Sequence, residues 1–163
     1  QPRSRGLGDV YKRQGFVLGG VVRGIIVGFL VLLTSLIFTD ITVQNIPLTL
    51  FVVVMTAFLF SIAGFLNALF ADNFDDINIV PTFILTPLIY LGGVFYSVEL
   101  LSNTWQIVSK ANPLLYMVNA FRYGMIGVSD INVQFALLMI IIFIIAFFLL
   151  AYYLLKKGYG IRS

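Results

Sequence analysis

The most constraining feature of this sequence is a run of apolar side chains over residues 133–155 that contains no charged residue. The hydrocarbon core of a bilayer is about 30 Å thick, so about 20 consecutive apolar residues in a helix cross it. Residues 16–38 and 47–70 form two further runs of this kind, and residues 79–96 form a fourth. Together the four runs predict an all-α membrane protein with four spans.

Composition excludes several other classes of protein. The chain is 60% hydrophobic and only 10% charged, whereas soluble domains carry about 25% charged residues. It contains no cysteine and no histidine, which excludes disulfides, thiol nucleophiles, histidine bases and the usual zinc ligands. We therefore expect no catalytic, metal-binding or cofactor-binding residue.

Residues 1–14 differ from the rest of the chain. Residues 9–14 read as the translation of a transposon-end adapter used in DNA-sequencing libraries, and appended segments of this kind are excluded from fold reasoning. Four of the ten basic residues and one of the seven acidic residues lie in 1–14, which leaves six of each in 15–163 and no net charge. A native basic arm is the alternative. We expect 1–14 not to be native and 15–163 to be part of a longer transmembrane domain.

Residues 80–124 depart from a simple span. Pro81 and Pro87 lie in an apolar helix, and Pro87 should kink it because proline has no N–H to donate. Gly92 and Gly93 then loosen its far end. Irregular backbone at membrane depth survives only where protein or a cavity covers it. This stretch is therefore expected to line a path, with the uniform spans as its scaffold.

Residues 98–127 are predicted to form two short helices that re-enter the membrane from outside without crossing it. Trp105 suits the membrane–water interface. Asn112 should end the first helix, because the residue before a proline is pushed away from helical geometry, and Pro113 should begin the second.

Arg122 lies on the second of these short helices. It should not face lipid, where a charge near the bilayer centre costs at least about 2.5 kcal/mol. Its expected partners are a polar group, backbone carbonyls freed around Gly92 and Gly93, or water. A role in fixing the helix pair is favoured over direct contact with a substrate.

Small residues recur in the first span. Gly20, Gly24 and Gly28 are four residues apart and share one helical face. Small residues at this spacing let two helices approach closely, either inside one bundle or between subunits. Arg23 lies near the start of the same span and is expected to snorkel or to pair.

Acidic residues precede two of the predicted helices. Asp75 or Asp76 is expected to cap the helix that follows, because carboxylates are favoured at a helix N-terminus. A magnesium site there would need further oxygen ligands or a phosphate. Ser129 and Asp130 are likewise expected to cap the last helix.

The basic tail predicts the orientation. Lys156 and Lys157 follow the last span, and basic residues beside a span favour the cytoplasm. The C-terminus and Asp75-Asp76 are then cytoplasmic, and residues 97–132 lie outside. If residues 114–128 crossed the membrane, the side of everything before them would reverse.

Four segments together resemble the ABC-2 type transporter permeases, chiefly the bacterial inner-membrane branch that exports polysaccharides, nodulation factors and drugs. They are PTFILTP at 81–87, LGGVFY at 91–96, Asn112-Pro113, and FRYG at 121–124, which includes Tyr123. The resemblance implies a fold of six spans with a re-entrant outer helix pair before the last one. Residues 15–163 would supply the third to sixth spans.

The resemblance also implies a function. The chain would be the membrane subunit of an ATP-driven exporter in the bacterial cytoplasmic (inner) membrane, forming the substrate path and the outer gate. Implied partners are a separate ABC ATPase that binds ATP and Mg²⁺, a second permease copy (a homodimer) and the lipid bilayer, but no nucleic acid. The chain has no G-x-x-x-x-G-K-[ST] phosphate loop and is not expected to be an enzyme. The residues expected in the gate and re-entrant region are Pro81, Pro87, Gly92, Gly93, Trp105, Asn112, Pro113, Arg122 and Tyr123.

Two other classes stay open from the residues alone. A secondary transporter or channel is the main alternative, but such proteins often carry buried ionisable residues or inverted repeats. Arg23 and Arg122 are the candidates for the former, and no internal repeat is visible. An intramembrane enzyme or an assembly scaffold is the third class. It is disfavoured because adjacent Asp75 and Asp76 would point about 100° apart on a helix.

Overall fold

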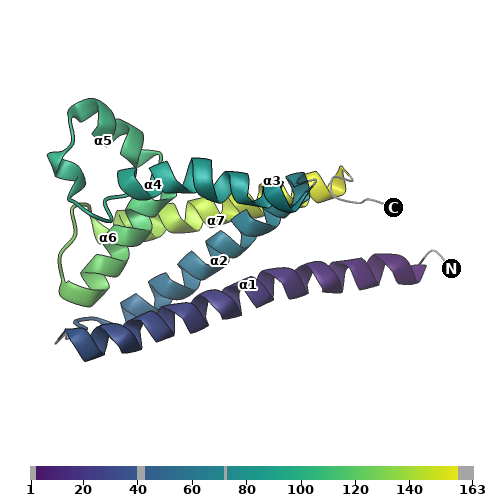
Figure 1. Ribbon diagram of the computed structural model, residues 1–163, viewed down its shortest axis with the longest axis horizontal. Helices are drawn as coiled ribbons and strands as arrows, with labels where there is room; N and C mark the ends of the chain where they lie inside the picture. Colours follow the sequence, from purple (N-terminus) through teal and green to yellow (C-terminus); the bar gives the residue numbers. More distant parts are fainter. Residues whose placement is uncertain (1–2, 40–42, 72, 158–163) are drawn as a thin grey trace.

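The computed structural model describes residues 3–39, 43–71 and 73–157, with side chains from residue 15 onward except those of Phe16, Phe74 and Asp75. Every helix or strand assigned within these ranges is a helix, as predicted (Figure 1). The long helices are α1 (Arg3–Phe38), α2 (Ile46–Phe70) and α7 (Val133–Lys156). Val17–Phe38, Ile46–Phe70 and Val133–Lys156 are each long and apolar enough to cross a membrane.

A shorter composite helix follows α2. It consists of α3 (Phe74–Ile79), the π-helical segment η1 (Val80–Leu85) and α4 (Thr86–Leu91), and the backbone stays right-handed at both junctions. The predicted extension of this helix to residue 96 is wrong. The helix ends at Leu91 because the chain turns at Gly92, and Gly93 takes a positive φ of 74° that favours glycine.

Three further helices connect α4 to α7: η2 (Val98–Leu100), α5 (Asn103–Lys110) and α6 (Pro113–Ile126). The break between α5 and α6 falls at Asn112, as predicted. The Asn112 side chain accepts a hydrogen bond from the backbone N–H of Leu114 at 3.0 Å. Pro113 occupies the first turn of α6, where a missing N–H costs nothing.

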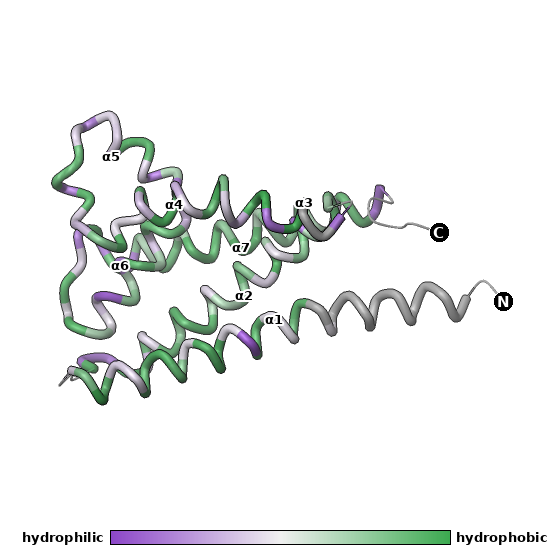
Figure 2. Tube along the Cα trace, in the orientation of Figure 1, coloured by the Kyte–Doolittle hydropathy of each residue, from purple (hydrophilic) through white to green (hydrophobic). Residues whose placement is uncertain are grey.

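The helices alternate in direction. In Figure 1 the N-terminal end of α1 and the C-terminal end of α7 lie at one end of the molecule, and α5 and α6 lie at the other. Figure 2 shows mostly apolar residues along the long helices, with polar residues gathered around α5 and the loops near α6. α2 contacts α1, α6 and α7, and α6 also contacts α7.

The core lies where α6 packs against α2 and α7. More than half of α6 is buried although the helix is short. The core residues that these three helices share are Val52, Leu59, Leu115, Met117, Ala120, Ala136 and Ile140. α6 is thus enclosed by the long helices and does not lie on their surface.

The small-residue face of α1 packs against α2. A Cβ at Gly24 would lie 3.1 Å from the Cβ of Ala57, and a Cβ at Gly20 would clash with the hydroxyl of Ser61. The close approach lets Ser61 Oγ donate to the backbone oxygen of Val17 at 2.6 Å. Gly28 lies further from its neighbour, 3.8 Å from Val53.

Helix caps differ in part from expectation. Asp76 accepts from the backbone N–H of Asn73 at 3.0 Å, at the start of α3, while the side chain of Asp75 lies outside the described residues. Ser129 and Asp130 do not cap α7, so that prediction is wrong. Asn132 is the cap, accepting from the N–H of Phe135 at 3.1 Å, because the helix begins only at Val133.

Candidate functional site

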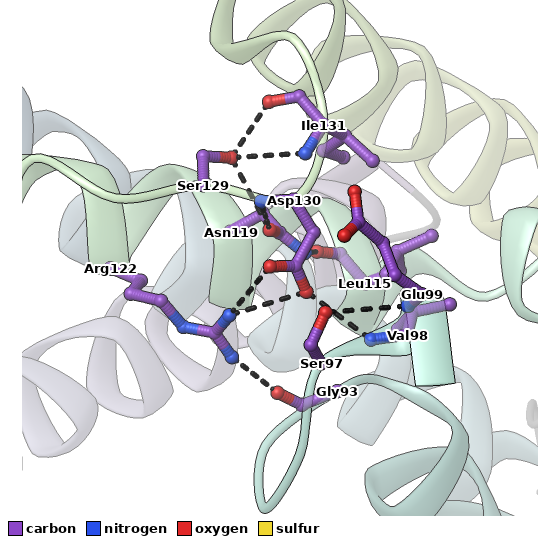
Figure 3. Close-up of polar contacts among 10 residues, drawn as sticks. All are labelled: Gly93, Ser97, Val98, Glu99, Leu115, Asn119, Arg122, Ser129, Asp130 and Ile131. Atoms are coloured by element: carbon purple, nitrogen blue, oxygen red, sulfur yellow. Dashed lines mark hydrogen bonds and ion pairs between the residues drawn. The ribbon is translucent and has the colours of Figure 1, made fainter. Parts of the chain in front are cut away.

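A polar cluster joins three segments near the α5–α6 end of the molecule (Figure 3). It brings together the turn after α4, helix α6 and the loop between α6 and α7. We call it the Arg122 cluster; its members are Gly93, Val98, Asn119, Arg122, Ser129 and Asp130. Its centre is the ion pair between Arg122 and Asp130.

Arg122 bridges two of these segments. Its Nη2 donates to the backbone oxygen of Gly93 at 2.6 Å, and its Nη1 lies 3.3 Å from both carboxylate oxygens of Asp130. The side chains of Arg122 and Asp130 are 22% and 11% exposed. Arg122 therefore finds two of the kinds of partner expected for it, a polar side chain and a carbonyl freed beside the glycine pair.

The glycine pair makes this contact possible. A Cβ at Gly92 would lie 2.9 Å from the Cβ of Leu114, and a Cβ at Gly93 would lie 2.9 Å from Val98 Cγ2. Both distances are too short for a real side chain, so the turn packs against α6 and η2 only with glycine. The positive φ of Gly93 adds a second reason for glycine at that position.

Asp130 connects the α6–α7 loop to η2. Its Oδ2 accepts from the backbone N–H of Val98 at 3.2 Å. The chain reaches this position because Gly127 ends α6 in the left-handed conformation, with a φ of 74°. The loop then turns back along the helix that carries Arg122.

Asn119 fixes the loop from within α6. It is 0% exposed, and its Oδ1 accepts from the N–H of Asp130 at 2.8 Å and from Ser129 Oγ at 3.2 Å. Its Nδ2 donates to the backbone oxygen of Leu115 at 2.9 Å. Both sides of the amide are used, as a buried polar group requires.

Sequence analysis missed Asn119 as a site residue and assigned Asp130 only to a cap. A signal was present, because Asn119 lies three residues before Arg122 and shares its helical face. Two polar residues on one face of an apolar helix indicate a common polar partner. Which residue supplies that partner depends on the path of the loop.

Asn112 ties α5 and α6 to the composite helix. Its Nδ2 donates to the backbone oxygen of Leu88 at 2.6 Å, and the residue is only 2% exposed. Leu88 lies in the last turn of α4, where helix carbonyls lose their own partners. Nearby, burial raises the pKa of the Tyr116 phenol, which donates to the oxygen of Lys110 at 2.6 Å.

The C-terminal end of α6 docks on the start of α2. The backbone N–H groups of Gln44 and Asn45 donate to the oxygens of Met125 and Gly124 at 3.1 and 2.9 Å. A Cβ at Gly124 would lie 2.5 Å from Thr49 Oγ1 and 3.1 Å from its backbone nitrogen. Glycine at 124 is therefore required for this contact.

Several predicted site residues lie apart from the Arg122 cluster. Pro81 and Pro87 are in the composite helix, and Trp105 is 52% exposed on α5. Tyr123 is 39% exposed and borders an open hollow of about 430 Å³. Also lining that hollow are Gly127, Ser129, Ile131, Asn132, Val133 and Gln134.

The cluster has the chemistry of a tether. Its groups are one ion pair, an amide, a hydroxyl and backbone atoms, with no arrangement of nucleophile and base. Within the part of the chain that the structure describes, no group of three or more acidic, cysteine or histidine residues is placed to bind a metal ion. The arrangement can hold segments together or release them.

Comparison with known proteins identifies the family. The sequence profile of the ABC-2 type transporter family matches residues 14–126. The chain is 48% identical over 149 residues to the inner membrane transport permease YadH of Escherichia coli K12, and equally to the protein of that name in Shigella flexneri.

The alignment to each relative covers 91% of this chain but 58% of the relative, so the chain spans little more than half of their length. No solved structure matches the chain. The family match includes the composite helix, the glycine pair and the segment from Asn112 to Arg122. With helices long and apolar enough to cross a membrane, the chain belongs to the ABC-2 type transporter family and is a membrane permease component.

Proposed function

We propose that the chain forms part of the membrane permease of an ATP-driven exporter in the bacterial inner membrane, supplying a substrate path and its outer gate. The observation that carries the proposal is the Arg122 cluster in a chain of this family. A single arginine there links the turn after α4, helix α6 and the α6–α7 loop. Breaking one cluster would free three segments at the same end of the bundle.

The proposed topology has four crossings. The composite helix Phe74–Leu91 has 18 residues in its three parts, which corresponds to about 27 Å at 1.5 Å per residue. That length approaches the thickness of a bilayer core. α5 and α6 would then form a re-entrant pair, because both ends of the pair lie at one end of the bundle (Figure 1).

The proposed orientation puts the C-terminus in the cytoplasm. Lys156 and Lys157 follow the last long helix, and basic residues favour that side. The end of the molecule with α5 and α6 would then face outward. A reporter fused after Ser163 should behave as cytoplasmic, and a periplasmic signal would contradict the orientation.

The proposed partners follow from the family. A separate ABC ATPase would bind ATP and Mg²⁺, because this chain has no phosphate-binding loop of the Walker type. A second permease copy would complete the path across the bilayer. These partners would convert ATP binding into movement of the helices.

Single cysteines test the re-entrant pair, because the chain has no native cysteine. Ser102→Cys before α5 and Val128→Cys after α6 are both at exposed positions. Both should react with a membrane-impermeant thiol reagent added from the outside. If the two positions react from opposite sides, α6 crosses the membrane and the re-entrant topology is wrong.

The role in ATP-driven export needs a functional test. The full-length permease carrying Val128→Cys would be co-reconstituted with its ATPase, and thiol labelling compared with and without ATP. We expect ATP to change the labelling rate at Val128→Cys, but not at Leu138→Cys, an exposed control in α7. An ATPase lacking its phosphate-loop lysine is the second control. Equal rates in all cases would contradict ATP-driven gating and favour a secondary transporter or channel.

We also propose that residues 1–14 do not belong to the native protein. The family match begins at residue 14, where the adapter-like residues end. Sequencing the locus from a library prepared without transposon adapters should give different codons before Gly15. The same fourteen residues in that sequence would overturn this proposal.

A further inference from the structure

The composite helix contains a feature that the gate does not use, the π-helical segment η1. It occupies Val80–Leu85 between two α-helical parts and lies between the cap of α3 and the end of α4. π-helical turns within α-helices are rare and are frequent at functional sites. Pro81 and Pro87 flank or enter the segment and remove two N–H donors from the regular pattern.

Side-chain hydrogen bonds replace part of what the prolines remove. In an α-helix the carbonyl of Ile77 would accept from residue 81, but Pro81 has no N–H. Asn67 of α2 donates to that carbonyl instead, at 2.8 Å. The carbonyl of Pro81 accepts from both the backbone N–H and the hydroxyl of Thr86, the latter at 3.2 Å.

The two halves of the composite helix are tied to different neighbours. Asn67–Ile77 ties α3 to α2, while Asn112–Leu88 ties α4 to the start of α6. Both ties use a side-chain amide and a backbone oxygen. The segment between them carries no tie of this kind to another helix in the described structure.

Packing also leaves the π segment free. No residue of η1 is buried, and Phe83 and Ile84 are 72% and 52% exposed. By contrast, Leu88 and Ile89 in α4 pack against the core beside α6. Neighbouring helices therefore hold the two ends of the composite helix more firmly than its middle.

We propose that η1 is a joint at which α3 and α4 move relative to each other. Exchange between the π and α hydrogen-bond registers would lengthen the segment and turn α4, while both ends keep their side-chain ties. Only backbone hydrogen bonds would change partners, since no buried side chain has to leave a core. α4, with the glycine turn and α6, can then be displaced without moving α3 away from α2.

Distance measurements between spin labels test the joint directly. One label pair, Asn78→Cys and Tyr90→Cys, crosses η1 at exposed positions twelve residues apart. The control pair, Leu138→Cys and Leu150→Cys, has the same spacing on exposed positions of the regular helix α7. Twelve residues of α-helix span about 18 Å.

In the full-length permease in lipid, we expect the pair across η1 to give a shorter mean distance and a broader distribution than the α7 pair. Replacing both prolines with alanine should restore α-helical donors, so that the distribution shifts to the mean and width of the control. A wild-type distribution as narrow as the α7 control would overturn the joint, and so would an unchanged distribution in the proline variant.

Thr86→Val provides a second variant in case the double proline variant fails to fold. It removes the hydroxyl bond to Pro81 and should shift the mean distance towards that of α7. Thr34→Val is the matched control, since Thr34 bonds only to carbonyls of its own helix α1. If Thr86→Val leaves the distribution unchanged, η1 is not the proposed joint. The readout needs no transport, so its failure is distinguishable from failure of the proposed function.

Discussion

The α1–α2 contact and the Arg122 cluster hold their helices by different means. α1 meets α2 through small side chains over several turns, with one hydroxyl-to-carbonyl bond between Ser61 and Val17. The Arg122 cluster instead joins three short segments through an ion pair, a buried amide and glycine turns. The first contact is spread over many atoms, whereas the second depends on a few.

This difference has consequences for movement. Dispersion contacts change gradually as two helices slide, and each is small. Hydrogen bonds between partly buried groups are either made or broken, and an unpaired partner is costly. A segment held by a few directed bonds is therefore suited to two discrete positions, and a long apolar contact is suited to a constant frame.

The largest expected effect is at the ion pair. Asp130→Ala leaves Arg122 partly buried without its carboxylate and removes the acceptor of the Val98 N–H. We expect a loss of about 3 kcal/mol in unfolding free energy, the low end for a buried pair because both side chains are partly exposed. Unfolding in mixed detergent micelles measures it, and Glu99→Gln, an exposed acid nearby, is the control.

The same pair supports a double-mutant test. Arg122→Met combined with Asp130→Leu removes both charges, so the double variant should lose less stability than the sum of the two single variants. Strict additivity would mean that the two side chains do not interact, and the contrast between the two regions would lose its main support.

A somewhat smaller loss is expected at Asn119. Asn119→Leu keeps the approximate volume but leaves the Asp130 N–H without its acceptor inside the protein. We expect a cost of about 2 kcal/mol for the unsatisfied group, together with increased proteolysis in the α6–α7 loop. Asn78→Leu, at an exposed position, should change neither. Wild-type stability in Asn119→Leu would show that water can replace the amide.

Gly124→Ala tests whether α6 is seated against α2 as tightly as its contacts indicate. The added methyl would meet Thr49 Oγ1 at 2.5 Å and backbone at 3.1 Å, so we expect a loss of about 1–2 kcal/mol from overpacking. Gly64→Ala is the matched control, since nothing lies within 4 Å of its Cβ position. It should stabilise α2 by up to about 1 kcal/mol. Equal effects of both changes would contradict the close contact.

The smallest effect is expected in the long-helix contact. Ser61→Ala removes the bond to Val17 and should cost about 0.6 kcal/mol, the average for hydrogen bonds between membrane helices. Ser35→Ala removes a bond within α1 alone and is the control. A loss as large as that of Asp130→Ala would erase the distinction between the two contacts.

Local sequence signals determined much of the secondary structure. The apolar runs and Pro47 predicted the long helices to within a residue or two at most ends, because length, hydropathy and helix-start residues act locally. The break at Asn112-Pro113 was predicted for the same reason. The end of the composite helix at Leu91 was not, since either glycine of the pair or a later residue could have ended it.

The need for partners at Arg122 also followed from the sequence alone, because a charge in an apolar segment has to be compensated wherever it lies. The identity of those partners was decided by the tertiary structure. Asp130 reaches Arg122 only after Gly127 reverses the chain, and the Gly93 carbonyl reaches it only because two glycines let the turn approach α6. The helices and their charges are local properties of the chain, but which carbonyl and which carboxylate meet the arginine depends on how distant segments pack together.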